Sequence, residues 1–254
     1  MANKYLNFIT DEHLFNCIEN LHNSYLKAKA NIDKKKFYSN KIDTIKLTFD
    51  SKFNDLDEES LLKAEMSRQI DKSINNSIGT FHEEILGGIK GFEKGSKSGY
   101  DIKAKNNKLF AEIKNKHNTM SSSSAEAAFQ KLARFADDYK QADCYLVDIL
   151  AKKSFIKKWS GLINGKEYSH SRVNRISGDQ FYSLLSGKSN SFFELYQILP
   201  KAISDYLGND EIKNSKINSA LEEIKVSSKT SKRSMLDEIT FENYSYYLGF
   251  DKLK

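Results

Sequence analysis

Cysteine and proline are scarce in this sequence. Its 254 residues include two cysteines, Cys17 and Cys144, and a single proline, Pro200. Two cysteines exclude a disulfide framework, and none of the five histidines forms a zinc-spaced set with them. The chain also lacks an internal repeat and any proline-rich or glycine-rich linker. We therefore expect one domain with elaborations, spanning residues 1–254.

Long hydrophobic runs are absent as well. No run approaches the roughly 20 apolar residues of a membrane-spanning helix. The first residues, MANKYLNFITDEHLF, lack the apolar core of a signal peptide. We therefore expect no membrane partner and a location in the reducing cytoplasm.

Charge is plentiful, with a surplus of positive charge. Charged residues make up 29% of the chain and apolar residues 39%, a balance typical of a globular protein with a well-charged surface. The formal net charge is +6 and the pI is about 9.0. This surplus favours a polyanionic partner but does not identify one, since many soluble proteins are mildly basic.

Hydrophobic periodicity predicts an α/β protein. Helices are expected over about 11–25, 57–88, 123–140, 179–185 and 191–207. Alternation predicts a strand in IDTIKLTFDSKF, the apolar run CYLVDIL predicts a buried strand at 144–150, and further strands are expected over 155–177. Ser123 and Glu126 stand at capping-box spacing, which favours a helix start at Ser123.

Three other segments carry weaker signals. The lysine run at 34–36 indicates a solvated loop, and the polar, lysine-rich stretch 208–235 indicates a mobile excursion. The segment FENYSYYLGF that follows is aromatic enough to dock on the body of the protein.

The stretch SGYDIKAKNNKLFAEIK, residues 98–114, predicts a β-hairpin. Asparagine tolerates the positive φ of a two-residue turn, so residues 106–107 are the expected turn. Ile102 then faces Ala111, and Asp101 faces Glu112. Directly opposed side chains have Cβ atoms about 4.5–5.5 Å apart, so two carboxylates are brought together.

The charged side chains of this hairpin share one face. Glu112 and Lys114 are two residues apart on one strand, so both lie on the face of Asp101, while Leu109, Ala111 and Ile113 can be buried on the other. Facing carboxylates repel each other unless a proton or a cation offsets them. Oxygen ligands at this separation suit Mg²⁺, and a nearby lysine can orient or deprotonate water. The alternative is a solvated hairpin whose charges are scattered by chance.

This arrangement resembles the core of the PD-(D/E)xK nucleases. Gly99-Tyr100-Asp101 stands in place of Pro-Asp, and Glu112-Ile113-Lys114 forms the second half of the motif. The expected order of helix, hairpin, helix and strand matches that core over about 58–150. The stretches RQIDKSINNSIGTFHEEIL and HSRVNRISGDQFYSLLSGKSNSFFELYQILPKAI further resemble the type II restriction endonucleases that cut GGNCC-type sites.

The resemblance implies a central mixed β-sheet flanked by helices, with helical N- and C-terminal elaborations. It implies a Mg²⁺-dependent endonuclease that cuts double-stranded DNA as a homodimer, leaves 5′-phosphates and is paired with a DNA methyltransferase. Asp101 and Glu112 would be the metal ligands, and Lys114 would serve the attacking water. Glu83 would be the supporting helix carboxylate, with Glu84 as its competitor. The catalytic core would span about 58–150, and recognition and dimer elaborations about 155–254.

Several basic and polar residues are candidates for contacts with DNA phosphates. Arg68 and Lys72 share a helix face on either side of Gln69, although pairing of Arg68 with Glu65 is the alternative. At the end of the catalytic strand, the candidates are Lys116, Asn118 and Thr119, with a solvated strand end as the alternative.

Base-reading candidates lie in HSRVNRISGDQ. Arg172 and Arg175 could each grip a guanine edge, the commonest specific contact. Asp179 or Gln180 could address another base edge, although Asp179 could simply cap the next helix. Two other functions stay open: a repair or recombination nuclease that selects DNA structure, and a non-catalytic DNA-binding module.

Overall fold

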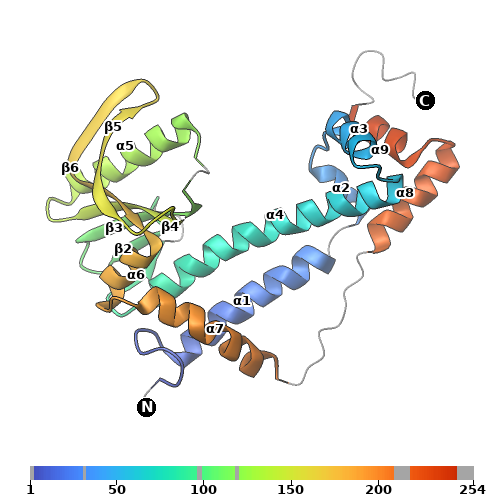
Figure 1. Cartoon of the computed structure of the whole chain (residues 1–254). Coiled ribbons are helices and arrows are strands. Elements are labelled where there is room, and N and C mark those ends of the chain that lie inside the picture. The colour runs from blue at the N-terminus through green and yellow to red at the C-terminus, as the bar shows by residue number, and fades with distance from the viewer. Residues whose placement is uncertain (1–2, 31–32, 96–98, 118–119, 209–217, 245–254) are drawn as a thin grey trace. The chain divides into compact units, whose positions relative to one another are not determined.

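The computed structural model describes residues 3–30, 33–95, 99–117, 120–208 and 218–244. It divides into two compact units (Figure 1). The first, here called the sheet unit, comprises Met1–Leu21 and Ser77–Asp210, and the second, the helical unit, comprises His22–Asn76 and Glu211–Lys254. Within the described ranges, no helix is both long enough and apolar enough to cross a membrane.

The sheet unit contains a six-stranded mixed sheet. Its strand order is β1-β2-β3-β4-β6-β5, in which β3, β4 and β6 run parallel and the outer pairs are antiparallel. The predicted central mixed sheet flanked by helices is therefore confirmed. The strands are β1 Phe92–Lys94, β2 Ile102–Ala104, β3 Leu109–Lys116, β4 Asp143–Leu150, β5 Ile156–Ile163 and β6 Lys166–Ser177.

Helices cover both faces of this sheet. On one face, Ala111, Ile113 and Val147 pack in a core with Phe81 and Ile85 near the end of α4 (Glu58–Gly87). The start of α1 (Asp11–Ala30), α6 (Gly178–Ser186) and α7 (Ser191–Leu207) contribute to the same core. The other face packs under α5 (Ser122–Asp138) through a core that includes Phe110, Leu146 and Val173.

The hairpin register is confirmed, although its turn is longer than predicted. Ile102 pairs with Ala111 and Lys103 pairs with Phe110. The turn spans four residues, Lys105 to Lys108, because the Asn107 N–H closes it on the carbonyl of Ala104. Asn107 has φ of +58°, the conformation that asparagine tolerates better than most residues. The asparagine pair therefore marks the turn but not its length.

The helix after the hairpin begins two residues earlier than the capping-box spacing predicts. Ser121 is the N-cap, and its hydroxyl accepts a hydrogen bond from the N–H of Ser124 at 3.2 Å. Glu126 does not complete a box, because it accepts hydrogen bonds from Asn164 and Tyr168 in the β5–β6 hairpin. Because the Glu126 carboxylate is bound by these distant donors, it is not available to the backbone N–H groups at the start of the helix.

The helical unit corrects the strand prediction for residues 42–53. Most of this stretch forms α3 (Thr44–Phe53), capped by Asp43, whose carboxylate accepts from the Lys46 N–H. Leu47 is buried, whereas Phe49 is exposed. The alternation of IKLTF was a weak signal, and the aspartate cap with burial of one side of the helix outweighed it.

Two further stretches of the helical unit are more ordered than predicted. The lysine run at 34–36 is not a loop, since it opens α2 (Lys34–Ser39) behind the cap Asp33. The stretch 208–235 is not an excursion throughout, because α8 (Asn218–Ser231) buries Leu221 and Ile224. The last helix is α9 (Met235–Tyr244), and the predicted docking of residues 245–250 lies outside the described residues.

Candidate active site

The centre of the candidate site is the middle of β3. Ala111 and Ile113 are buried on one face of the sheet, so the intervening Glu112 and the following Lys114 point to the face that α5 covers. Glu112 is only 9% exposed. A buried carboxylate needs cationic or hydrogen-bonding partners, and its neighbours supply them.

Asp101 lies immediately before β2 and bonds to β3 through both its backbone and its side chain. Its N–H donates to the carbonyl of Ala111 at 3.0 Å. Its Oδ2 accepts from the N–H of Ile113 at 2.7 Å. In a regular antiparallel ladder a backbone carbonyl of the neighbouring strand would accept this hydrogen bond, so the Asp101 carboxylate stands in for that carbonyl. Burial raises the pKa of the Asp101 carboxyl; the Ile113 N–H opposes the rise and the charge of Glu112 adds to it.

Two lysines hold Glu112. The Lys114 Nζ donates to Oε1 at 2.8 Å, and the Lys131 Nζ, from α5, donates to Oε2. Burial acts to raise the pKa of Glu112, but the hydrogen bonds from these ammonium groups outweigh it, and its pKa lies below the usual range.

Lys131 contacts Glu112 but was not among the site residues predicted from the sequence. The available signal was its position directly before Leu132, next to the buried stripe of a helix that covers the catalytic strand. A lysine there can reach the sheet, whereas most lysines of this chain point to water.

Glu83 is the helix carboxylate that is coupled to this cluster. Burial raises its pKa, and the charges of Asp101 and Glu112 raise it further, while Lys94 opposes the shift. The Lys94 Nζ lies 3.5 Å from both Glu83 and Glu84. Glu84 is also hydrogen-bonded to Asn20 at 3.3 Å. Electrostatic coupling to both β-hairpin acids therefore favours Glu83 over Glu84.

His82, beside Glu83, has an ordinary structural place. Its Nδ1 lies 2.9 Å from the hydroxyl of Tyr182, and burial lowers its pKa to about 4. The neutral ring packs against Tyr182 and Phe192.

The cluster as a whole can receive a divalent cation. Asp101 and Glu83 have raised pKa values, which indicates that their negative charges are under-compensated where they stand. A cation would offset this charge, and carboxylate oxygens are the ligands that Mg²⁺ prefers. In the described part of the chain, no three or more His, Cys, Asp or Glu side chains are grouped so that they could hold a metal ion. A cation at this position would therefore take at most two carboxylate ligands from the described residues, and its other ligands would have to come from water or substrate.

Comparison with known proteins identifies the family. The family model described as Eco47II restriction endonuclease matches residues 6–208. This chain belongs to the Eco47II restriction endonuclease family. It is 42% identical to the type II restriction enzyme Sau96I of Staphylococcus aureus, over 98% of this chain and 100% of that protein. It is 30% identical to the type II restriction enzyme Eco47II of Escherichia coli, over 78% of this chain and 86% of that protein.

Membership in this family confirms the predicted function class. The protein is a site-specific endonuclease of a restriction system, and its substrate is DNA. A repair nuclease that selects DNA structure and a non-catalytic DNA-binding module are thereby set aside.

In this restriction endonuclease, the two arginines considered for base reading have partners within the chain. The Arg172 guanidinium donates to the carbonyls of Tyr139 and Ala142. Arg175 donates to Asp148 at 2.6 Å, and its guanidinium lies 5.9 Å from the centre of the Trp159 ring. These bonds hold the guanidinium groups against the protein, but each guanidinium has further N–H donors beyond the nitrogen that makes them.

Asp148 is a second residue that the sequence analysis missed. It is 1% exposed in β4, directly beside Lys114 in the strand register. Its Oδ1 has no hydrogen-bond partner in the structure. The available signal was the single carboxylate in the apolar run CYLVDIL, since a buried aspartate requires a cationic partner.

The other candidates near the sheet lie on its periphery. The Gln180 side chain is exposed and donates to the Ser154 hydroxyl at 2.8 Å. Asp179 is in the first turn of α6 and accepts from the Ser177 hydroxyl, while Ser177 occupies the N-cap position itself. Lys116 is exposed at the end of β3. Asn118 and Thr119 lie outside the described residues.

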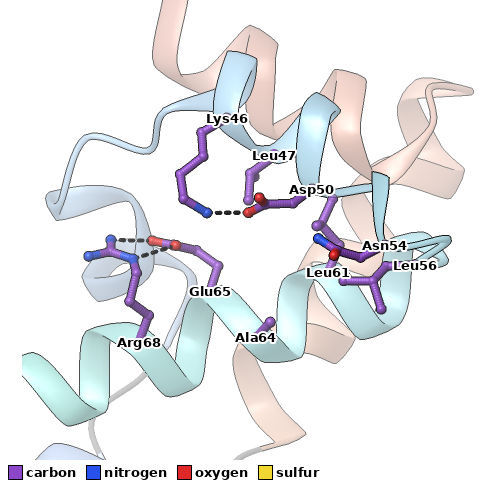
Figure 2. Close-up of a pocket in the computed structure, with 9 residues that line it drawn as sticks. All are labelled: Lys46, Leu47, Asp50, Asn54, Leu56, Leu61, Ala64, Glu65 and Arg68. Atoms are coloured by element: carbon purple, nitrogen blue, oxygen red, sulfur yellow. Dashed lines mark hydrogen bonds and ion pairs between the residues drawn. The ribbon is translucent and has the colours of Figure 1, made fainter. Parts of the chain in front are cut away.

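Three candidates for phosphate contacts are in the helical unit. The Arg68 guanidinium binds Glu65 through two hydrogen bonds, as Figure 2 shows beside the small pocket between α3 and α4. Gln69 is buried, and its amide contacts Glu65 and the carbonyl of Phe37. Lys72 is exposed. The intrahelical pairing considered for Arg68 is therefore present, and Gln69 has a structural place.

Proposed function

We propose that this protein is a Mg²⁺-dependent endonuclease that cuts both strands of a GGNCC-type site and leaves 5′-phosphates. The observation that supports the metal assignment is the position of Asp101 and Glu112 on the two neighbouring arms of the hairpin, where Asp101 accepts from the N–H of Ile113 and Lys114 lies 2.8 Å from Glu112. The GGNCC assignment is supported by the resemblance of the sequence to cutters of such sites.

In this proposal, Asp101 and Glu112 hold the cation and Glu83 supports it from α4. The cation, when bound, supplies Lewis-acid polarisation of the phosphate and stabilisation of the leaving oxygen. Lys114 orients the attacking water, since its ammonium is fixed 2.8 Å from the Glu112 carboxylate and carries two further donors. The burial of Glu112 under α5 keeps these groups in a fixed geometry before DNA arrives.

The contacts with DNA are proposed from exposure and charge. Lys72 and Lys116 contact phosphates, because both carry exposed ammonium groups. Arg68 adds positive charge beside Lys72, although Glu65 neutralises part of it. Asn118 and Thr119 follow Lys116 in the chain and keep their assignment as phosphate contacts. Base contacts by Arg172, Arg175 and Gln180 would use the donors and acceptors that their present bonds leave over, or would replace those bonds.

The assembly follows from the symmetry of the substrate. A near-palindromic site that is cut on both strands calls for a two-fold protein, so we propose a homodimer. Cleavage of such a site in the host genome would be lethal, so a DNA methyltransferase of the same specificity protects it. Both proteins then act in the cytoplasm, where the DNA is.

The test is the variant Asp101→Ala, assayed on plasmid DNA with Mg²⁺. It should abolish cleavage, by at least a factor of about 100, while retaining DNA binding in a gel-shift assay. The matched control is Asp138→Ala, at the exposed end of α5, which should cut like the wild type. Sequencing the ends of wild-type fragments identifies the site and the 5′-phosphate. Retained cleavage by Asp101→Ala, or ends without a common GGNCC sequence, would contradict the proposal.

A further inference from the structure

Glu112 is shared between two ammonium groups from different elements. Lys114 comes from the same strand and occupies Oε1, whereas Lys131 comes from α5 and occupies Oε2. The two salt bridges place positive charge on both oxygens of the carboxylate that is proposed to bind the cation. A cation that binds either oxygen would share it with an ammonium group, and the two positive charges would repel each other.

Lys131 is the partner that a substrate can draw away. Its side chain is 27% exposed and that of Lys114 is 30% exposed, so both are partly accessible to solvent, but only Lys131 belongs to an element outside the catalytic hairpin. Its position is set by the helix, because Ala128 and Leu132 are buried against the sheet on either side of it. The charge of Lys131 also acts on Asp101, so a single ammonium lies within electrostatic reach of both proposed metal ligands.

The charges of the cluster show what would follow when DNA arrives. Lys114 and Lys131 already place two positive charges at Glu112, so a divalent cation bound there would bring three cationic groups to one carboxylate. A DNA phosphate supplies the matching negative charge and an acceptor for the displaced ammonium. Cation and phosphate are therefore each more favourable when the other is present.

We propose that Lys131 is a positioning residue that couples metal binding to DNA binding. In the enzyme without DNA, its ammonium competes with the divalent cation for Glu112. When DNA is bound, the ammonium turns to a backbone phosphate and Glu112 becomes available to the cation. The inference rests on the proposed function, since it needs Glu112 to be a metal ligand. By linkage, the cation must raise the affinity for DNA by the same factor that DNA raises the affinity for the cation.

Calorimetric titration with Ca²⁺ tests this coupling on the full-length protein. Ca²⁺ takes the same oxygen ligands as Mg²⁺, and gel analysis after each titration verifies that the DNA is intact. The wild type should bind Ca²⁺ on the order of tenfold more tightly with a duplex containing the cleavage site than without it. Lys131→Met should bind Ca²⁺ more tightly than the wild type without DNA, and should lose most of the gain from DNA.

Arg134→Met is the matched control, because it removes one positive charge from the exposed side of the same helix. It should keep the wild-type affinities and the gain from DNA. Lys131→Gln, which retains an N–H donor without the charge, serves as a second variant if Lys131→Met unfolds, and it should behave in the same way.

The outcomes separate this inference from the proposed function. If Lys131→Met and Lys131→Gln bind Ca²⁺ as the wild type does, or keep its full gain from DNA, the coupling role of Lys131 is wrong while the metal site stands. If Asp101→Ala binds Ca²⁺ and cuts DNA as the wild type does, the metal site itself is wrong.

Discussion

Asp101 occupies a position at which a negative charge is unfavourable in the absence of a cation. Burial and the neighbouring Glu112 both raise its pKa, and one backbone hydrogen bond from Ile113 offsets only part of this. The same features suit metal binding, because the cation supplies the missing positive charge. The buried charge of Asp101 therefore lowers the stability of the metal-free protein at the residue on which the proposed chemistry depends.

We predict that Asp101→Asn stabilises the metal-free protein at pH 8. A group whose pKa is raised by folding contributes stability below its unfolded pKa, and that contribution is lost as the pH rises through the folded pKa. Asparagine cannot ionise, so the variant does not lose this stability as the pH rises. Its side-chain oxygen can still accept the hydrogen bond from the Ile113 N–H. The gain in Tm should be present at pH 8 with a chelator, and should vanish below about pH 3.9, the ordinary aspartate value.

Thermal unfolding between pH 3 and pH 8 measures this difference. Asp138→Asn, at an exposed position on α5, should show no comparable gain. A lower Tm for Asp101→Asn than for the wild type at pH 8 would show that the surroundings of Asp101 do not disfavour its charged form.

The helix α5 has three functions at the scale of elements. It covers one face of the sheet with Phe129 and Leu132, and it presents Lys131 to Glu112. Through Glu126 it also holds the β5–β6 hairpin, where Tyr168 donates to the same carboxylate. Stability of this helix therefore supports both the core and the candidate site.

The cap of α5 gives a prediction that distinguishes the observed helix start from the predicted one. Ser121→Ala removes the acceptor of the Ser124 N–H and should lower the free energy of unfolding by about 1 kcal/mol. Ser123→Ala, at the start that the sequence spacing favoured, should change it by less than about 0.5 kcal/mol. Chemical denaturation of both variants makes the comparison, and equal losses would place the cap elsewhere.

At the scale of the whole molecule, the chain divides into a sheet unit and a helical unit. The candidate catalytic residues all belong to the sheet unit, whereas Arg68, Gln69 and Lys72 belong to the helical unit. The prediction of a single nuclease domain over residues 1–254 stays a prediction.

The proposed homodimer makes a prediction about strand cleavage. Heterodimers of the wild type with Asp101→Ala should each contain one competent site, so they should nick supercoiled plasmid and accumulate the open circle. Wild-type homodimers should yield the linear form, since both strands are cut in one complex. Co-expressed, differently tagged subunits provide the heterodimer for gel analysis. Linear product at the wild-type rate would rule out one active site per strand.

Much of the fold could be predicted because its signals are local. The strand at CYLVDIL, the helices near 11–25 and 58–87 and the hairpin register depend on apolar periodicity and turn residues close in sequence. The strand predicted at 42–53 was wrong because the alternation there competes with an aspartate cap whose effect depends on packing of Leu47. Short alternating runs cannot separate these outcomes.

Most of the candidate site that could be predicted lies within one hairpin, whereas Glu83, on a helix, was predicted from the family resemblance. Asp101, Glu112 and Lys114 fall within fourteen consecutive positions, and strand alternation places their side chains. Lys131 and Asp148 reach the site from a later helix and strand, so no spacing along the chain predicts them. The bonds of Arg172 and Arg175 to internal partners likewise depend on residues about 30 positions away.

The sequence by itself determined which side chains alternate along β3, where the hairpin turns, and to which family of endonucleases the chain belongs. Only the tertiary structure decided which charges meet: that Glu112 is held by two lysines, that Glu83 is coupled to the hairpin acids, and that Arg175 is paired with a buried Asp148. The physical reason is the distance along the chain over which each effect acts. Backbone periodicity acts over a few residues, whereas the energy of a buried charge depends on every group that packing brings near it.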